Sequence, residues 1–221
     1  MSVIAIVGAE ADLARAVAEQ FGGHGFHVAL VGQGLDELAV NLSGNGTHAT
    51  AFPCVIADGA ALTATMTDAV TALGAIDVLV FSNRDVLPTT TAMEARPENL
   101  RPELDRHFYA GVTATNAILP PMLESGSGTL FFVISGAAIH PDPAFAGSSA
   151  AQAALRNWTL GLAQELKPVG VAATAVVIDA YLGTQPPAPG IDFLSPTHLA
   201  EKLWAHHTGD PRAEVVLTGS K

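Results

Sequence analysis

The chain has 221 residues, of which 49% are apolar and 14% charged, and its formal net charge is −11. These values predict one folded domain over residues 1–221, and the acidic balance argues against nucleic acid or an anionic membrane as a partner. The single cysteine, Cys54, excludes an internal disulfide, and with no basic secretion signal and no apolar run of roughly 20 residues we expect a cytoplasmic protein.

Strand-like and helix-like segments alternate along the chain. Short apolar runs end at Val7, Val31, Cys54, Phe81, Ile134, Ile178 and Leu217. Amphipathic segments cover Asp12–Phe21, Leu35–Leu42, Ala60–Leu73, Glu98–Leu123, Ala150–Leu166 and Pro196–His206. This alternation predicts parallel βαβ units, and hence a Rossmann-like, doubly wound α/β fold with a seven-stranded parallel sheet in three layers. Ser195 followed by proline is typical of a helix start.

The first predicted strand, Val3–Val7, runs into a glycine and then directly into a helix. This outline is typical of a turn that binds a dinucleotide phosphate, with Gly8 as its first glycine. Asp12 and Ala14 stand where two further glycines are usual, and Glu10 adds a second negative charge. Acidic side chains stabilise a helix start, but they use the positive potential that a phosphate needs.

The segment Ala153–Leu166 (AALRNWTLGLAQEL) closely resembles the helix after the active site in the short-chain dehydrogenase/reductase family. The resemblance continues through Ile76–Asn83 (IDVLVFSN), Ala117–Met122 (AILPPM), Gly128–Ala138 (GTLFFVISGAA) and Val176–Thr184 (VVIDAYLGT), so it spans nearly the whole chain. It implies a dinucleotide-binding fold. In active members it also implies hydride transfer with an Asn, Ser, Tyr and Lys set.

Alignment on that helix implies that this active site is atypical. Ser148 falls at the family's Tyr position and Gln152 at its Lys position, while His107 falls at its Asn position and Ser135 at its Ser position. Only Ser135 is retained. A serine hydroxyl donates protons poorly without a base, and an uncharged glutamine cannot lower a neighbour's pKa. The resemblance therefore implies a pseudo-oxidoreductase without the Tyr–Lys mechanism.

The positions that the resemblance assigns to the cofactor are changed as well. Gln33 is neither the acid expected for NAD nor the base expected for NADP, and Arg84 replaces a glycine beside the cofactor ribose. The positions are Gly8, Asp12, Gln33, Arg84, Gln152 and Thr184. We expect the protein to bind no cofactor, and we expect NADP or NAD to bind only if the cofactor cleft is still open. We hypothesise that Arg84 and Asp12 meet across the cleft and close it.

Polar side chains are expected to line a pocket above the fifth and sixth strands, together with Phe145 and Asp179. Ser135 and His107 form a candidate hydroxyl–base pair, because histidine generally ionises near neutral pH. The candidate catalytic residues are Ser135, His107, His140, Ser148 and Tyr181. No metal site is predicted, because His206 and His207 are adjacent and point in different directions on a helix. Cys54 is expected in the core.

Three functions remain open. The first is cofactor-free acid–base chemistry, of isomerase, dehydratase or cyclase type, on a small carbonyl compound. The second is an NAD(P)H-dependent oxidoreductase with proton delivery through His107 or Tyr181. The third is a non-catalytic subunit paired with an active homologue. The resemblance implies a homodimer or homotetramer formed through Glu98–Leu123 and Ala150–Leu166, and the short loop Thr184–Phe193 implies an open pocket or one closed by a neighbouring subunit.

Overall fold

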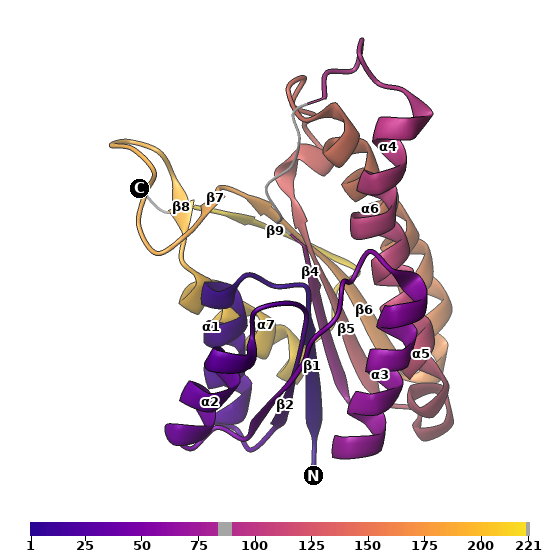
Figure 1. The fold of residues 1–221 in the computed structure, drawn as a ribbon, viewed down its shortest axis with the longest axis vertical. Helices are drawn as coiled ribbons and strands as arrows, with labels where there is room; N and C mark the ends of the chain where they lie inside the picture. The colour runs from indigo at the N-terminus through magenta and orange to yellow at the C-terminus, as the bar shows by residue number, and fades with distance from the viewer. Residues whose placement is uncertain (84–89, 220–221) are drawn as a thin grey trace.

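The computed structural model describes residues 1–83 and 90–219, and it has a parallel sheet of seven strands between two layers of helices (Figure 1). The strands are β1 (Val3–Val7), β2 (His27–Val31), β3 (Ala49–Phe52), β4 (Val78–Ser82), β5 (Gly128–Ser135), β6 (Val171–Asp179) and β9 (Glu214–Thr218). Their order in the sheet is β3-β2-β1-β4-β5-β6-β9, and every pairing is parallel. The predicted Rossmann-like fold is therefore confirmed.

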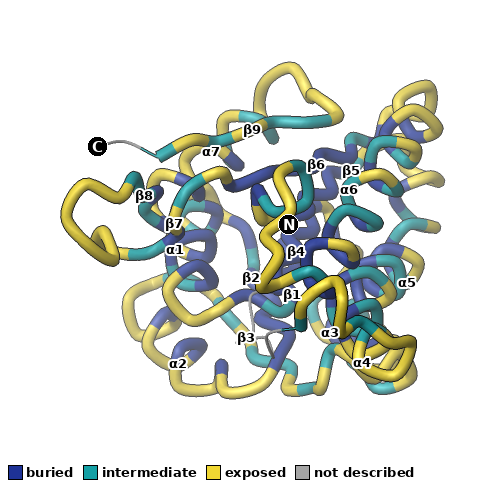
Figure 2. The backbone as a smooth tube through the Cα atoms, turned by 90° about the horizontal axis from the view of Figure 1, so that it is seen from above, coloured by how far each residue is buried: buried dark blue, intermediate teal, exposed yellow. Residues whose placement is uncertain are grey.

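Alternate strand residues face opposite helix layers. Ile4 and Ile6 of β1 pack with the layer formed by α1 (Ala11–Gly22), α2 (Asp36–Gly44) and α7 (Pro196–Thr208). Val3, Ala5 and Val7 pack with the layer formed by α3 (Gly59–Leu73), α5 (Ala110–Ser125) and α6 (Ala146–Leu166). Strands buried on both faces explain the continuous apolar runs in the sequence. Figure 2 shows the buried residues in the sheet and on the inner helix faces, with exposed loops around them.

Two helix starts test the predicted boundaries. Ser195 caps α7 through its hydroxyl, which accepts a hydrogen bond from the His198 N–H at 3.1 Å, as predicted. By contrast, α6 begins at Ala146 rather than at the predicted Ala150. The early start brings Gly147 against Glu103, where an added Cβ would lie 3.3 Å from the Glu103 side chain. Packing between helices therefore extends α6 through residues of low helix propensity.

The predicted helix Glu98–Leu123 is three segments. It consists of α4 (Pro97–Glu103), a π-helical stretch (Leu104–Tyr109) and α5. A π-helical turn holds an extra residue and so changes which side chains share a face. Apolar periodicity does not reveal such a turn, and here it lies next to the candidate site, since it contains His107.

A second small sheet follows β6. It pairs β7 (Tyr181–Leu182) with β8 (Phe193–Leu194), and its backbone bonds include the Tyr181 N–H to the Asp192 carbonyl at 3.2 Å. The loop whose shortness implied an open pocket, or one closed by a neighbouring subunit, thus begins and ends at this small sheet. In Figure 1 the small sheet of β7 and β8 projects beside the carboxyl ends of the main strands.

In the described parts of the chain, no helix has the length and apolarity required to cross a bilayer.

The surroundings of His207 predict how the free energy of unfolding depends on pH. The His207 ring lies 5.6 Å from the Trp204 ring between centroids, and its Nδ1 is 3.0 Å from the Thr129 hydroxyl. Burial lowers the pKa of His207, although nearby Asp77 raises it. The unfolded chain therefore binds a proton at His207 more readily than the folded protein does. The contribution of His207 to the free energy of unfolding is complete above about pH 6.5 and is lost as the pH falls.

We expect the variant His207→Gln to flatten the fall in the free energy of unfolding between about pH 7 and pH 5. Urea denaturation at several pH values measures this slope. His140→Gln is the matched control, because His140 is exposed, and it should retain the wild-type slope. A wild-type slope in His207→Gln would contradict the assignment.

Candidate active site

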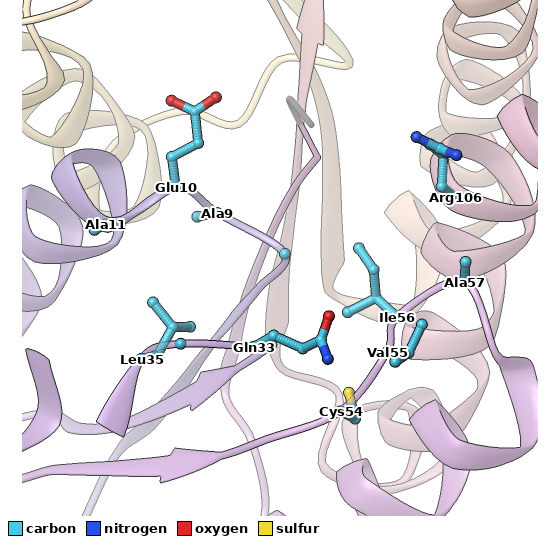
Figure 3. Close-up of a pocket in the computed structure, with 13 residues that line it drawn as sticks. Ala9, Glu10, Ala11, Gln33, Leu35, Cys54, Val55, Ile56, Ala57 and Arg106 are labelled. Atoms are coloured by element: carbon cyan, nitrogen blue, oxygen red, sulfur yellow. The ribbon is translucent and has the colours of Figure 1, made fainter. Parts of the chain in front are cut away.

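Two cavities lie at the carboxyl ends of the strands, on either side of the point between β1 and β4 where the strand order reverses. Doubly wound sheets place their ligands at this point. The β1–β3 cleft, of about 340 Å³, is lined by Gly8, Ala9, Glu10, Ala11, Gly32, Gln33, Gly34, Leu35, Cys54, Val55, Ile56, Ala57 and Arg106 (Figure 3). The β4–β6 pocket, of about 450 Å³, is lined by Asn83, His107, Val133, Ile134, Ser135, Ala137, Asp142, Phe145, Ser148, Gln152, Ile178, Ala180 and Tyr181.

The turn after β1 requires its glycine for reasons of packing. Gly8 has a φ of 73°, and a Cβ there would lie 2.7 Å from both the Ile56 Cδ1 and the Ser82 carbonyl oxygen. Ala14 is fully buried on α1. Asp12, which was expected beside the cofactor, is exposed and is absent from the lining of the cleft. Its place as the acid of the turn is taken by Glu10.

The β1–β3 cleft carries one acid and one base among its described lining residues. Figure 3 shows Glu10 at the start of α1 and Arg106 on the helix across the cleft. The Glu10 side chain makes no capping hydrogen bond to α1, whereas the Arg106 Nε donates to the Pro102 carbonyl at 3.1 Å. Gln33 lines the cleft, as the sequence suggested. Glu10 therefore adds a negative charge at the N-terminus of α1, the end of a helix where anions generally bind.

Three predicted positions in this region have different outcomes. Cys54 was expected in the core, but it is half-buried and lines the cleft, and burial raises the pKa of its thiol. Thr184 is exposed and lines neither cavity. Arg84 lies outside the described residues. The hypothesised contact between Arg84 and Asp12 therefore stays a prediction, and Asp12 itself is exposed and absent from the lining of the cleft.

The β4–β6 pocket collects four of the five predicted catalytic residues. They are Ser135, His107, Ser148 and Tyr181. His140 is exposed and outside the lining, because the chain after β5 forms a short helical turn, Gly136–Ala138, that carries it away. Asp179 also lies outside the lining of the pocket. Its Oδ1 lies against Gly136, where an added Cβ would be 2.6 Å from that oxygen. Asp142 provides the acid instead.

Gln152 connects two of these residues. Its Oε1 accepts the Ser135 backbone N–H at 2.7 Å, and its Nε2 donates to the Ser148 hydroxyl at 3.0 Å. Only the amide oxygen can accept the N–H, so the orientation of the amide is fixed. Ser148 is thus the acceptor in its bond with Gln152, and its own proton is directed elsewhere. The spacing of four residues on a helix is the sequence signal for this contact.

His107 is paired with a carboxylate that sequence reasoning missed. The His107 Nε2 lies 3.4 Å from the Glu103 Oε2, and the two side chains are 2% and 6% exposed. Neither atom has a hydrogen-bond partner among the described residues. Among the described residues no hydrogen bond joins His107 to Ser135, although both line the pocket, and the Ser135 hydroxyl accepts the Ala137 N–H at 3.2 Å. The pair again has a spacing of four residues.

The family model described as short chain dehydrogenase matches residues 2–185. The chain belongs to the short chain dehydrogenase family. Dehydrogenase/reductase SDR family member 4 from Homo sapiens is 31% identical over 170 residues, which are 75% of this chain and 61% of that protein. This match therefore covers less than two thirds of the length of the human relative.

A second relative and a solved structure are also similar to the chain. Inactive hydroxysteroid dehydrogenase-like protein 1 from Danio rerio is 28% identical over 210 residues, which are 91% of this chain and 64% of that protein. The crystal structure of L-sorbose reductase from Gluconobacter frateurii, complexed with NADPH and L-sorbose, has a TM-score of 0.87 and 20% identity over 99% of this chain and 96% of that chain. The second likeness confirms the fold.

Proposed function

We propose that this member of the short chain dehydrogenase family moves a proton at the carbon next to the carbonyl group of a small molecule, without a nicotinamide cofactor. The reaction class is that of an isomerase, dehydratase or cyclase. The observation that carries the proposal is the buried pair of Glu103 and His107, because His107 lines the β4–β6 pocket. A histidine oriented by a carboxylate is a well-suited general base.

In this proposal the basic nitrogen of the imidazole follows from the pair. The Glu103 carboxylate lies 3.4 Å from the Nε2 of His107 and favours the tautomer with its proton on that nitrogen, because a buried carboxylate is costly unless it is paired. The lone pair is then on the Nδ1 of His107. From there the imidazole takes a proton from the substrate carbon, and the electron pair of the broken C–H bond moves into the carbonyl oxygen. A proton then returns from the imidazole to carbon, either to a different carbon in an isomerisation or, after exchange with solvent, to the same carbon.

The negative charge on the oxygen requires hydrogen-bond donors. Ser148 supplies one, because Gln152 occupies its acceptor side and leaves its O–H free to point into the pocket. Ser135 supplies a second, since its hydroxyl accepts from Ala137 and has its own proton available. Donors aimed at a developing oxyanion are among the largest contributions to catalysis.

The positions that the resemblance assigns to Tyr and Lys support chemistry other than hydride transfer. Ser148 and Gln152 stand there, and both ends of the Gln152 amide are engaged in hydrogen bonds. An amide carries no charge and so cannot supply the electrostatic role of a lysine. Glu10 at the start of α1 also fits a cofactor diphosphate poorly.

The experiment is solvent deuterium incorporation into a ketone, followed by proton NMR. The probe is para-tert-butylacetophenone, whose methyl hydrogens lie next to the carbonyl. We expect loss of the methyl signal at a rate above that of buffer alone. A rate equal to the buffer rate, for this ketone and for its charged analogues described below, would contradict proton transfer.

One observation favours a second candidate, an NAD(P)H-dependent oxidoreductase. The β1–β3 cleft lies where this fold binds dinucleotides, and a neighbour of the same fold is a reductase complexed with NADPH. We expect calorimetric titration with NADPH and NADH to give no binding tighter than about millimolar. Glu10→Gln should then strengthen binding about tenfold, because it removes a charge facing the diphosphate.

Glu19→Gln is the matched control for this titration, since it removes the same charge from the exposed far end of α1. It should leave the affinity unchanged. Micromolar binding to the wild-type protein would instead favour the reductase, with proton delivery by His107 or Tyr181. The domain span 1–221, the non-catalytic subunit and assembly through Glu98–Leu123 and Ala150–Leu166 remain predictions.

A further inference from the structure

The mouth of the β4–β6 pocket combines an acid with two exposed aromatic rings. Asp142, Phe145 and Tyr181 all line it, and Phe145 and Tyr181 are 39% and 45% exposed. Asp142 is the one formally charged residue, histidine aside, in the described lining, which contains neither lysine nor arginine. Exposed aromatic side chains at the entrance of a cavity mark a surface available to a ligand.

Local hydrogen bonds hold the acid and the first ring in place. The Asp142 Oδ1 accepts the Ala144 N–H at 2.8 Å, and the Asp142 carbonyl accepts the Phe145 N–H at 3.0 Å. This is a turn in which an aspartate side chain bonds its own backbone two residues on. The Asp142 carboxylate and the Phe145 backbone are therefore held in one turn before any ligand arrives.

The second ring is held by the small sheet of β7 and β8. The Tyr181 N–H is bonded to the Asp192 carbonyl, and the ring folds over Gly183. A Cβ at Gly183 would lie 2.5 Å from the Tyr181 Cε1, so any larger residue there would displace the ring. The glycine thus keeps Tyr181 at the mouth of the pocket.

We propose that the substrate carries a cationic ammonium group, bound at Asp142 between Phe145 and Tyr181, with its carbonyl directed inward. The inference rests on the proposed proton transfer for that inward orientation. Aromatic faces attract ammonium groups, most strongly quaternary ones, and a carboxylate adds an opposite charge. The net charge of −11 raises the local concentration of cations further. A carboxylate-bearing substrate would be repelled by Asp142 and would meet no lysine or arginine among the described lining residues.

The test compares three ketones that differ in one group. They are para-acetylphenyltrimethylammonium, its neutral isostere para-tert-butylacetophenone, and the anion para-acetylbenzoate. We expect calorimetry to give about tenfold tighter binding for the cation than for the neutral isostere, and the weakest binding for the anion. Equal affinities, or tighter binding of the anion, would overturn the proposal.

Variants assign the preference to this site. Asp142→Asn should reduce the ratio of cation to isostere affinity to about threefold or less, and Tyr181→Leu should reduce it while retaining apolar contact. Asp68→Asn is the matched control, because it removes the same charge from the exposed surface of α3. A ratio that falls equally in Asp68→Asn would overturn the assignment to Asp142.

Binding and chemistry are separated by using both measurements on the same ketones. A preference for the cation without deuterium incorporation would leave the ligand class standing and contradict the proposed proton transfer. Deuterium incorporation with no preference for the cation would leave the proton transfer standing and contradict the proposed ligand class. Both outcomes are read from the full chain without any added cofactor.

Discussion

Replacing His107 with glutamine is expected to reduce the rate of methyl deuterium exchange by about a hundredfold or more. The imidazole is the only described lining group of the β4–β6 pocket that is oriented by a buried carboxylate, at 3.4 Å from Glu103. Glutamine retains much of the volume but cannot accept a proton from carbon. Exchange is measured by NMR on ketones of the series above.

The surrounding variants separate catalysis from folding. Glu103→Gln should slow exchange less than His107→Gln does, since it changes the orientation of the base and leaves the base present. The double variant Ser135→Ala with His107→Ala should abolish the reaction. His198→Gln, on the exposed face of α7, is the matched control and should keep the wild-type rate. An unchanged rate in the double variant, with a wild-type circular dichroism spectrum, would remove this site assignment.

Gln152→Glu should lower the exchange rate by about tenfold to a hundredfold, although it changes a single group of the side chain. A carboxylate can still accept the Ser135 N–H, but its second oxygen accepts from the Ser148 hydroxyl and does not donate to it. The proton of Ser148 would then point away from the substrate oxygen. Gln152 is therefore a positioning residue that acts through Ser148.

A double-mutant cycle distinguishes this role from a structural one. Ser148→Ala should cause a loss similar to that of Gln152→Glu, and the two changes together should cost little more than one alone. Gln164→Glu, exposed on the same helix, introduces the same charge and should leave the rate unchanged. Additive losses in the cycle, or a wild-type rate in Gln152→Glu, would contradict the proposed orientation of the hydroxyl.

The sheet and most helices could be predicted from the sequence, because burial on one or both faces imposes its period directly on the chain. Runs such as Val176–Ile178 are apolar at consecutive positions and lie in a strand covered by helices on both sides. Ser195 marked the start of α7 through a local hydrogen bond that its own neighbours supply. Signals of this kind need no knowledge of the tertiary structure.

The candidate site depended on contacts that a one-dimensional pattern does not record. The π-helical stretch and the early start of α6 bring Glu103, His107 and Gly147 together, and neither feature changes apolar periodicity. Asp142 replaced His140 and Asp179 in the pocket because short turns after β5 and β6 decide which side chains face inward.

By itself the sequence determined the order of strands and helices and the edge of the sheet where ligands bind, since local periodicity and topology rules are sufficient for both. Only the tertiary structure decided which polar groups of the site donate hydrogen bonds, which accept them and which face the pocket. The direction of the Gln152 amide, the pairing of His107 and the inward face of Ser148 each depend on atoms from different elements meeting within hydrogen-bond or ion-pair distance. Such distances are fixed by packing, which combines residues far apart in the chain.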